Sequence, residues 1–183
     1  MRWLIFVLLL PGLCAAQQDP PNSMLLVAKP ELTDPNFRET VVLVTQTPDW
    51  STVGVILNRP TAAKHDATGQ VLHEGGPVMQ GVTLALFRSQ TPPKAAAFRV
   101  LPNVYLSMHP ENVEKLAPRA ARYRLFTGFS GWAPGQLQSE IARDGWHLLP
   151  ASEALLFRQD TSGMWRELLD TARRKKTQVY SFQ

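Results

Sequence analysis

Short apolar runs bounded by turn residues recur along the chain and predict a domain in which strands outnumber helices. Residues 40–45 and 53–57 are continuous β-branched runs of the kind that form strands buried on both faces. Turn-forming residues at 48–50 separate them, so the two runs predict a hairpin at the centre of a sheet. Further strands are expected at 24–28, 82–87, 98–101, 104–106, 123–128 and 146–149.

Helices are expected at four places in the second half of the chain, one of them after the glycine loop at 128–135. Residues 110–116 predict a short helix that must end before Pro118, and residues 152–158 predict another. From about Met164 an apolar stripe runs to four cations at 173–176, which would complement the dipole at the end of a helix. The whole pattern predicts an α/β protein of the mixed α+β kind, with a mainly antiparallel sheet.

Glycines indicate where the backbone path is restricted. Gly54 lies inside a predicted strand, which indicates a close backbone approach or a bulge. Residues 75–77 are Gly-Gly-Pro and require an unusual path, whereas 61–70 reads as a looser stretch. Residues 128–140 predict a strand end, a tight glycine loop and a helix that has Pro134 in its first turn and stops at Gly145.

The composition is that of an ordinary globular domain. Of 183 residues, 44% are hydrophobic and 19% are charged, with 15 prolines and 11 glycines. These values exclude a coiled coil, collagen, a disordered chain and a polytopic membrane protein. No repeat or linker divides the chain, which is long enough to build a core without disulfides or a metal.

The amino terminus has the layout of a secretory signal peptide. Arg2 precedes an apolar run at 3–10, which is followed by Pro-Gly and by small residues up to Ala16. The run is shorter than the roughly 20 residues of a membrane-spanning helix. We expect cleavage near Ala16, a single domain at 17–183 and a periplasmic or secreted protein, with no transmembrane segment in the mature chain. A buried amino-terminal element is the alternative.

The only cysteine, Cys14, lies inside this segment. The mature chain would therefore have no disulfide and no thiol chemistry. Cys14 would be the acylated residue of a lipoprotein, but Leu13 is bulky where lipoprotein signals carry a small residue.

Of the net charge of +4, Arg2 contributes one unit and the carboxyl-terminal segment contributes the other three. Residues 17–157 carry 12 basic and 12 acidic side chains, whereas 158–183 carry six basic and three acidic ones. A single cluster of four cations without interleaved aromatic residues is a weak indication of nucleic-acid binding. The charge pattern therefore disfavours nucleic acid as a partner.

Enzymatic motifs fail on spacing. Around Ser130 the sequence is Gly-Phe-Ser-Gly-Trp, in which Trp132 stands where a nucleophile elbow needs its second glycine. His109 and His147 are available as bases, so a hydrolase using Ser130 remains an alternative. His73-Glu74 begins like a zinc-protease helix, but the Gly-Gly-Pro that follows forbids that helix. No spacing of a metal site, phosphate loop or dinucleotide fingerprint occurs, and no cofactor is expected.

What remains is a set of polar, glycine and tryptophan residues in predicted loops. Such loops bind peptides, small ligands or anions, but the same residue types also cap turns and fill cores. We expect a non-enzymatic binding protein for an unknown protein partner or small ligand. The candidate binding residues are Asn58, Arg59, Glu74, Gly75, Gly76, Pro77, Ser130, Gly131, Trp132 and Gln136.

Four motifs in order resemble the AlgH/YqgE family, bacterial proteins described as regulators of transcription. They are Leu25-Leu-Val-Ala-Lys-Pro-Glu-Leu-Thr-Asp-Pro-Asn-Phe-Arg-Glu-Thr-Val-Val-Leu43, Gly54-Val-Ile-Leu-Asn-Arg-Pro60, Gly75-Gly-Pro-Val78 and Gly128-Phe-Ser-Gly-Trp-Ala-Pro-Gly-Gln-Leu-Gln-Ser-Glu140. The resemblance implies one domain with a bifurcated, mostly antiparallel sheet, curled into a pseudo-barrel and flanked by helices. It supplies no catalytic residues.

Two departures from the family bear on function. Relatives begin at the first strand and look cytoplasmic, whereas this chain has the export pattern. Where relatives often carry an acidic residue and then His, this chain has Gln46-Thr47. The first departure favours a binding protein of the cell envelope over a cytoplasmic regulator, and the second removes a possible His-dependent site.

Overall fold

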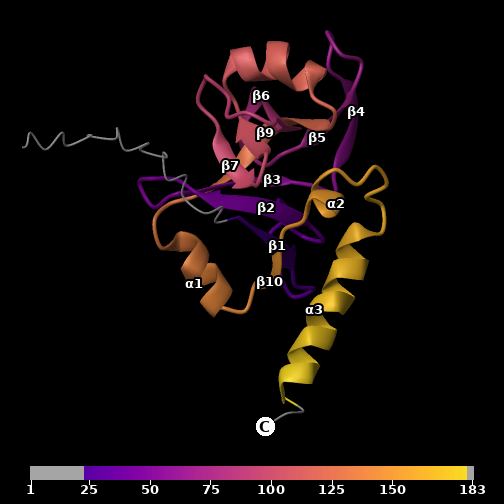
Figure 1. The fold of residues 1–183 in the computed structure, drawn as a ribbon. Coiled ribbons are helices and arrows are strands. Elements are labelled where there is room, and N and C mark those ends of the chain that lie inside the picture. Colours follow the sequence, from indigo (N-terminus) through magenta and orange to yellow (C-terminus); the bar gives the residue numbers. More distant parts are fainter. Residues whose placement is uncertain (1–22, 181–183) are drawn as a thin grey trace, which may run out of the picture.

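A computed structural model describes residues 23–180, with side chains as far as Arg174, and shows a mixed α+β fold (Figure 1). Ten strands form one branched sheet whose main path runs β10-β1-β2-β3-β9-β6-β8-β7, with β4 and β5 beside it. The strands are β1 (Met24–Ala28), β2 (Val41–Gln46), β3 (Thr52–Ile56), β4 (Pro60–Lys64), β5 (Val71–Glu74), β6 (Val78–Arg88), β7 (Phe98–Leu101), β8 (Val104–Ser107), β9 (Tyr123–Trp132) and β10 (Trp146–Pro150).

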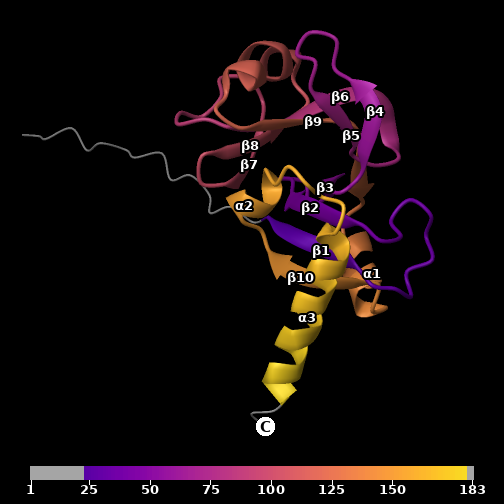
Figure 2. The same ribbon diagram turned by 90° about the vertical axis from the view of Figure 1, so that its right-hand side faces the viewer.

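The helices flank this sheet. A π-type turn, η1 (Glu111–Leu116), and a 3-10 turn, η2 (Ala117–Arg119), lie at one end of the molecule, and α1 (Gln136–Ala142) lies near the other. The short α2 (Glu153–Leu156) leads into α3 (Met164–Tyr180). Figure 2 shows α3 beside β1 and β10, with its carboxyl end extending away from the sheet.

Strand β9 joins the two halves of the sheet. Its last residues pair with β3, its first residues pair antiparallel with β6, and β5 pairs with it in parallel. All other strand pairs are antiparallel. The expected α+β fold with a branched, mostly antiparallel sheet is therefore confirmed. The main path ends at β10 and β7, so the sheet is not closed into a barrel.

The predicted central hairpin is confirmed by β2 and β3, which pair in antiparallel register. Leu43 and Val55 lie in the core cluster under α2 and α3, whereas Val42 and Ile56 lie in the cluster under α1. The continuous apolar runs thus bury both faces of the sheet. At Gly54 a Cβ would lie 2.7 Å from the carbonyl oxygen of Leu43, so this glycine marks a close approach.

Three expectations about local structure are wrong. Residues 60–64 form β4 although they lack an apolar pattern, because they pair with β5 and stay mostly exposed. The predicted glycine loop at 128–132 is the continuous second half of β9, where Gly128 adopts a φ of +67°. Gly135, not Pro134, precedes the first helical residue of α1, because it takes the left-handed conformation at the cap.

The interpretation of the cations at 173–176 as a helix end is also wrong. The apolar stripe of α3 is confirmed, since Met164, Leu168, Leu169 and Ala172 pack in the main core. The helix continues beyond the stripe to Tyr180, so the cations do not occupy its last turn. The predicted signal segment at 1–16 lies outside the described residues.

Candidate functional site

Asn58 holds the start of β2. Its Oδ1 accepts the backbone N–H of Val41 at 2.8 Å, and its Nδ2 donates to the carbonyl of Glu39 at 2.9 Å. Glu39 has a φ of 56°, a conformation that non-glycine residues seldom adopt. Both ends of the Asn58 amide therefore stabilise the turn that precedes β2.

Arg59 braces the loop that precedes β2. Its Nη1 donates to the carbonyl of Asn36 at 2.8 Å, and its Nη2 donates to that of Arg38 at 3.1 Å. The same side chain lies 3.5 Å from the carboxylate of Glu74, with the two side chains 26% and 38% exposed. The structure thus brings these two predicted site residues together as a partly exposed ion pair.

Residues 75–77 carry the chain from β5 across β9. A Cβ on Gly75 would lie 2.1 Å from the carbonyl oxygen of Gly128, and one on Gly76 would lie 2.3 Å from Oγ of Ser130. Gly76 also has a φ of +150°. Atoms of β9 therefore leave no room for a side chain at either position, so both residues must be glycine. Pro77, which follows them, is exposed.

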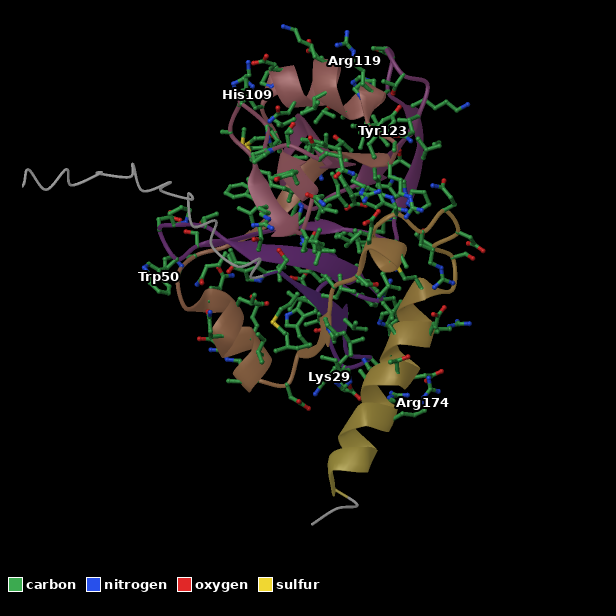
Figure 3. The ribbon with its side chains drawn as sticks, in the orientation of Figure 1. Lys29, Trp50, His109, Arg119, Tyr123 and Arg174 are labelled. Atoms are coloured by element: carbon green, nitrogen blue, oxygen red, sulfur yellow. The ribbon has the colours of Figure 1, made fainter. Side chains whose placement is uncertain are left out.

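Ser130 has no access to a substrate. Its side chain is 0% exposed and its Oγ donates to the carbonyl of Gly75 at 3.0 Å. It lies within β9, beside the exposed Gly131, and not on a strand-to-helix turn. The candidate base His109 accepts the backbone N–H of Glu111 at 3.3 Å, beside η1 (Figure 3). The geometry therefore gives a hydrolase no nucleophile at Ser130.

Trp132 and Gln136 belong to the packing of α1. The indole nitrogens of Trp132 and Trp146 both donate to Oε2 of Glu140, at 3.0 and 3.1 Å. Phe37 stacks on Trp132 with 5.5 Å between ring centroids. Gln136 donates to Oε1 of Glu140 at 3.3 Å. Glu140 therefore links α1 to the sheet.

A cavity of about 210 Å³ lies elsewhere, at residues that sequence reasoning did not single out as a site. The β4–β5 hairpin, the start of β9 and the loop after α2 line it. A second hollow of about 400 Å³ shares three of its residues. We call the two together the Arg124 cleft. Figure 3 shows Tyr123, a residue of both hollows, on the side that carries β4 and β5. The smaller cavity is lined by Pro60, Gln70, Val71, His73, Tyr123, Arg124 and Gln159.

Arg124 places a buried positive charge in the wall of this cleft. The residue is 5% exposed; its Nη1 donates to the carbonyl of Leu57 at 3.2 Å and its Nη2 to that of Arg158. Among the described side chains no carboxylate forms an ion pair with it. Burial lowers the pKa of Arg124 to about 10, which still leaves it protonated at pH 7. Buried charges are costly unless they are paired.

Two further polar atoms of the cleft wall lack partners in the described part of the chain. Nδ1 of His73 and Oε1 of Gln70 are both buried and make no hydrogen bond. Burial and the charge of Arg124 lower the pKa of His73 to about 4. Backbone hydrogen bonds at Val71 and Leu125 raise this pKa, but their effect is smaller. His73 is therefore neutral at pH 7, with one ring nitrogen able to accept a hydrogen bond.

The sequence carried a signal for Arg124. It lies in the apolar run 123–128, where a charged residue inside a buried strand needs a partner. His73 was weighed only as a metal ligand, and Gln70 lies in a stretch that looked unstructured.

No group of three or more potential metal ligands occurs among the described residues. Within that same part, no helix is both long and apolar enough to span a bilayer.

Comparison with known proteins identifies relatives across most of the chain. A family model described as DUF179, AlgH-like, matches residues 25–176. A UPF0301 protein of Thermobifida fusca is 35% identical over 165 residues, which cover 79% of this chain and 83% of that protein. A UPF0301 protein of Chlorobaculum tepidum is 31% identical over 152 residues, which cover 77% and 81%.

Two solved structures share the fold. The solution structure of the AlgH protein from Pseudomonas aeruginosa has a TM-score of 0.67 and 24% identity, and the match covers 86% of this chain and 92% of that one. An X-ray structure of a Corynebacterium diphtheriae protein has a TM-score of 0.68 and 24% identity, covering 82% and 86%. At this identity the likeness concerns the fold alone.

Proposed function

The chain belongs to the AlgH-like family, and we propose that it is a non-enzymatic binding protein that takes a small polar ligand into the Arg124 cleft. One observation carries this proposal: a cavity of about 210 Å³ is lined by His73 and Gln70, each with a buried polar atom that lacks a partner. Leaving such an atom unpaired costs about 1–3 kcal/mol, and native proteins contain few of them. A ligand that supplied the partners would recover that free energy on binding.

The residues of the smaller cavity favour binding over catalysis. Its lining contains no Ser, Cys, Lys, Asp or Glu that could act as a nucleophile or carboxylate base. The lowered pKa of His73, about 4, makes it a weak general base at neutral pH, because an effective general base has a pKa near the working pH. The polar groups of the cleft are therefore suited to hold a ligand.

The binding function is tested by screening small polar compounds against two matched variants. Val71, 36% exposed, lines the cleft, whereas Val78, 37% exposed, does not. We expect Val71→Trp to fill the cleft and Val78→Trp to leave it open. Sugars, amino acids, hydroxy acids and inorganic anions are screened by thermal shift, and each hit is measured by calorimetry.

A compound that binds the wild type and Val78→Trp but not Val71→Trp supports the proposal. A wild type that binds no compound, or equal binding by both variants, contradicts it.

We also propose that the protein acts in the cell envelope. The support is the signal-like pattern of residues 1–16, which precedes the region matched by the family model. Mass spectrometry of the amino terminus from fractionated cells tests this. A chain that begins near Gln17 in the periplasmic fraction is the expected result. An intact Met1 in the cytosolic fraction would contradict export and favour a cytoplasmic role.

A further inference from the structure

We infer that the ligand of the Arg124 cleft is a small oxyanion that also carries an O–H donor, the chemistry shared by hydrogen phosphate and short hydroxy carboxylates. This inference rests on the binding function proposed above and adds the chemical class of the ligand. Three features of the cleft carry it: a buried cation without a counter-charge, two buried acceptors without donors, and the small volume of the cavity that these three residues line.

The described carboxylates around the cleft do not pair with Arg124. Asp160, next to the lining residue Gln159, accepts hydrogen bonds from Ser162 at 2.7 and 3.0 Å. Glu74 pairs with Arg59, and Glu167 pairs with Arg158 at 2.6 Å. On the other side of the cleft, Glu153 is shared between Arg88 and Arg122, at 3.7 and 3.4 Å. Among the described side chains, this leaves Arg124 without a carboxylate and its surroundings with an excess of positive charge.

The guanidinium of Arg124 still has donors to offer. A guanidinium has about five N–H donors in a planar fork, and two of its nitrogens donate to the carbonyls of Leu57 and Arg158. Those carbonyls fix the orientation of the group without neutralising it. An oxyanion at the cleft would accept the remaining N–H groups in the geometry that arginine favours for carboxylates and phosphates.

The acceptors in the cleft select against an anion that only accepts. Nε2 of Gln70 donates to the carbonyl of Tyr123 at 3.5 Å, which leaves its Oε1 as the unpaired end of the amide. Nδ1 of neutral His73 is a second acceptor when the ring proton lies on the other nitrogen. Sulfate would set an oxygen lone pair against these atoms, whereas a ligand with an O–H group would donate to them.

The volume limits the size of the ligand. The smaller cavity of the Arg124 cleft, which His73, Gln70 and Arg124 line, has a volume of about 210 Å³. This space suits phosphate or a hydroxy acid of two to four carbons. Larger ligands would have to extend into the neighbouring hollow.

The inference is tested by calorimetry with two pairs of anions at constant ionic strength in chloride. Phosphate is compared with sulfate, and glycolate with acetate, because each pair differs in the O–H donor. We expect phosphate to bind at least about tenfold more tightly than sulfate, and glycolate several-fold more tightly than acetate.

Equal binding within both pairs overturns the donor requirement. If only neutral compounds from the screen bind, the assignment of the ligand as an oxyanion is wrong, although the binding function stands. If nothing binds, the binding function itself fails.

Variants localise the site. Gln70→Glu places a carboxylate in the cleft, so we expect it to abolish phosphate binding and to raise the melting temperature of the ligand-free protein. Gln138→Glu, exposed on α1, makes the same charge change away from the cleft and should bind like the wild type. Arg124→Lys keeps the positive charge but loses the planar set of N–H donors, so it should weaken phosphate binding at least about tenfold. Arg143→Lys, at an exposed position away from the cleft, is the control and should bind phosphate like the wild type. Wild-type affinity in Gln70→Glu and Arg124→Lys overturns the assignment of the site.

Discussion

At Gly76 the backbone of one segment lies directly against another and leaves no space for a side chain. A Cβ there would lie 2.3 Å from Oγ of Ser130 and 2.5 Å from the backbone of Phe129. We expect Gly76→Ala to lower the free energy of unfolding by about 2–4 kcal/mol, because overpacking adds to an unfavourable φ. Gly81→Ala, with open space around it, is the control. Urea unfolding measures both, and equal stability of the two variants would contradict the packing described here.

His73 gives the protein a pH-dependent stability. Its pKa is lowered from 6.5 to about 4 in the folded protein, chiefly by burial and by the charge of Arg124. Below pH 6.5 the unfolded chain therefore takes up a proton that the folded one does not, and stability falls as the pH falls from about 6.5 to 4. The expected loss is about 1–3 kcal/mol.

The measurement is the difference in unfolding free energy between the wild type and His73→Gln, followed by urea unfolding from pH 8 to pH 4. Gln does not titrate, so subtracting its curve removes the contribution of the other ionisable groups. The wild type should lose stability relative to the variant over this range. A constant difference would show that His73 is not held neutral.

For single residues, the sequence predicted which types are constrained but not what constrains them. Asn58 and Trp132 were identified as candidates because loops with special geometry need such residues. Their polar atoms turn out to hold a turn and a helix. Composition and spacing do not distinguish a capping amide from a ligand-binding one, since both need the same donors and acceptors. Arg124 was overlooked although a charge inside an apolar run signals the need for a partner, because the pattern does not show what that partner is.

Helix α1 depends on a single carboxylate. Glu140 accepts the indole N–H groups of both Trp132 and Trp146. We expect Glu140→Ala to destabilise the protein by about 2–4 kcal/mol, because two largely buried donors lose their acceptor. Glu140→Gln keeps an acceptor oxygen and should cost about 1 kcal/mol.

Urea unfolding followed by tryptophan fluorescence checks this ranking. Gln138→Ala on the same helix is exposed and serves as the control. If Glu140→Ala were as stable as Gln138→Ala, the carboxylate would not be what holds α1 to the sheet.

At the scale of elements, strands with apolar runs were predictable and strands without them were not. The β2–β3 hairpin follows from its two continuous β-branched runs, which fill two cores at once. Strand β4 has no such pattern, since it is held by backbone pairing to β5 and stays mostly exposed. The second half of β9 was expected to be a loop because its glycines suggested a turn. Gly128 instead allows the backbone of residues 76–80 to approach the strand closely.

At the scale of the whole molecule, the cleft exists because the sheet branches at β9. The β4–β5 hairpin leaves the main path there, and the loop after α2 returns to the same place. Arg124 donates to the carbonyl of Leu57, the residue that follows β3, and to that of Arg158 in the loop after α2. Sequence reasoning could not place these segments together, because the cleft depends on contacts between residues 34 and 67 positions apart.

The most direct test of the anion site is a crystal structure of the protein soaked with arsenate, which has the charge and the O–H donor of phosphate and an anomalous signal. An anomalous peak in the Arg124 cleft is expected, with arsenate oxygens about 3 Å from the guanidinium nitrogens of Arg124. It should also place an oxygen within hydrogen-bond distance of Oε1 of Gln70 or Nδ1 of His73. A cleft without anomalous density, in crystals where arsenate binds elsewhere, would contradict the site.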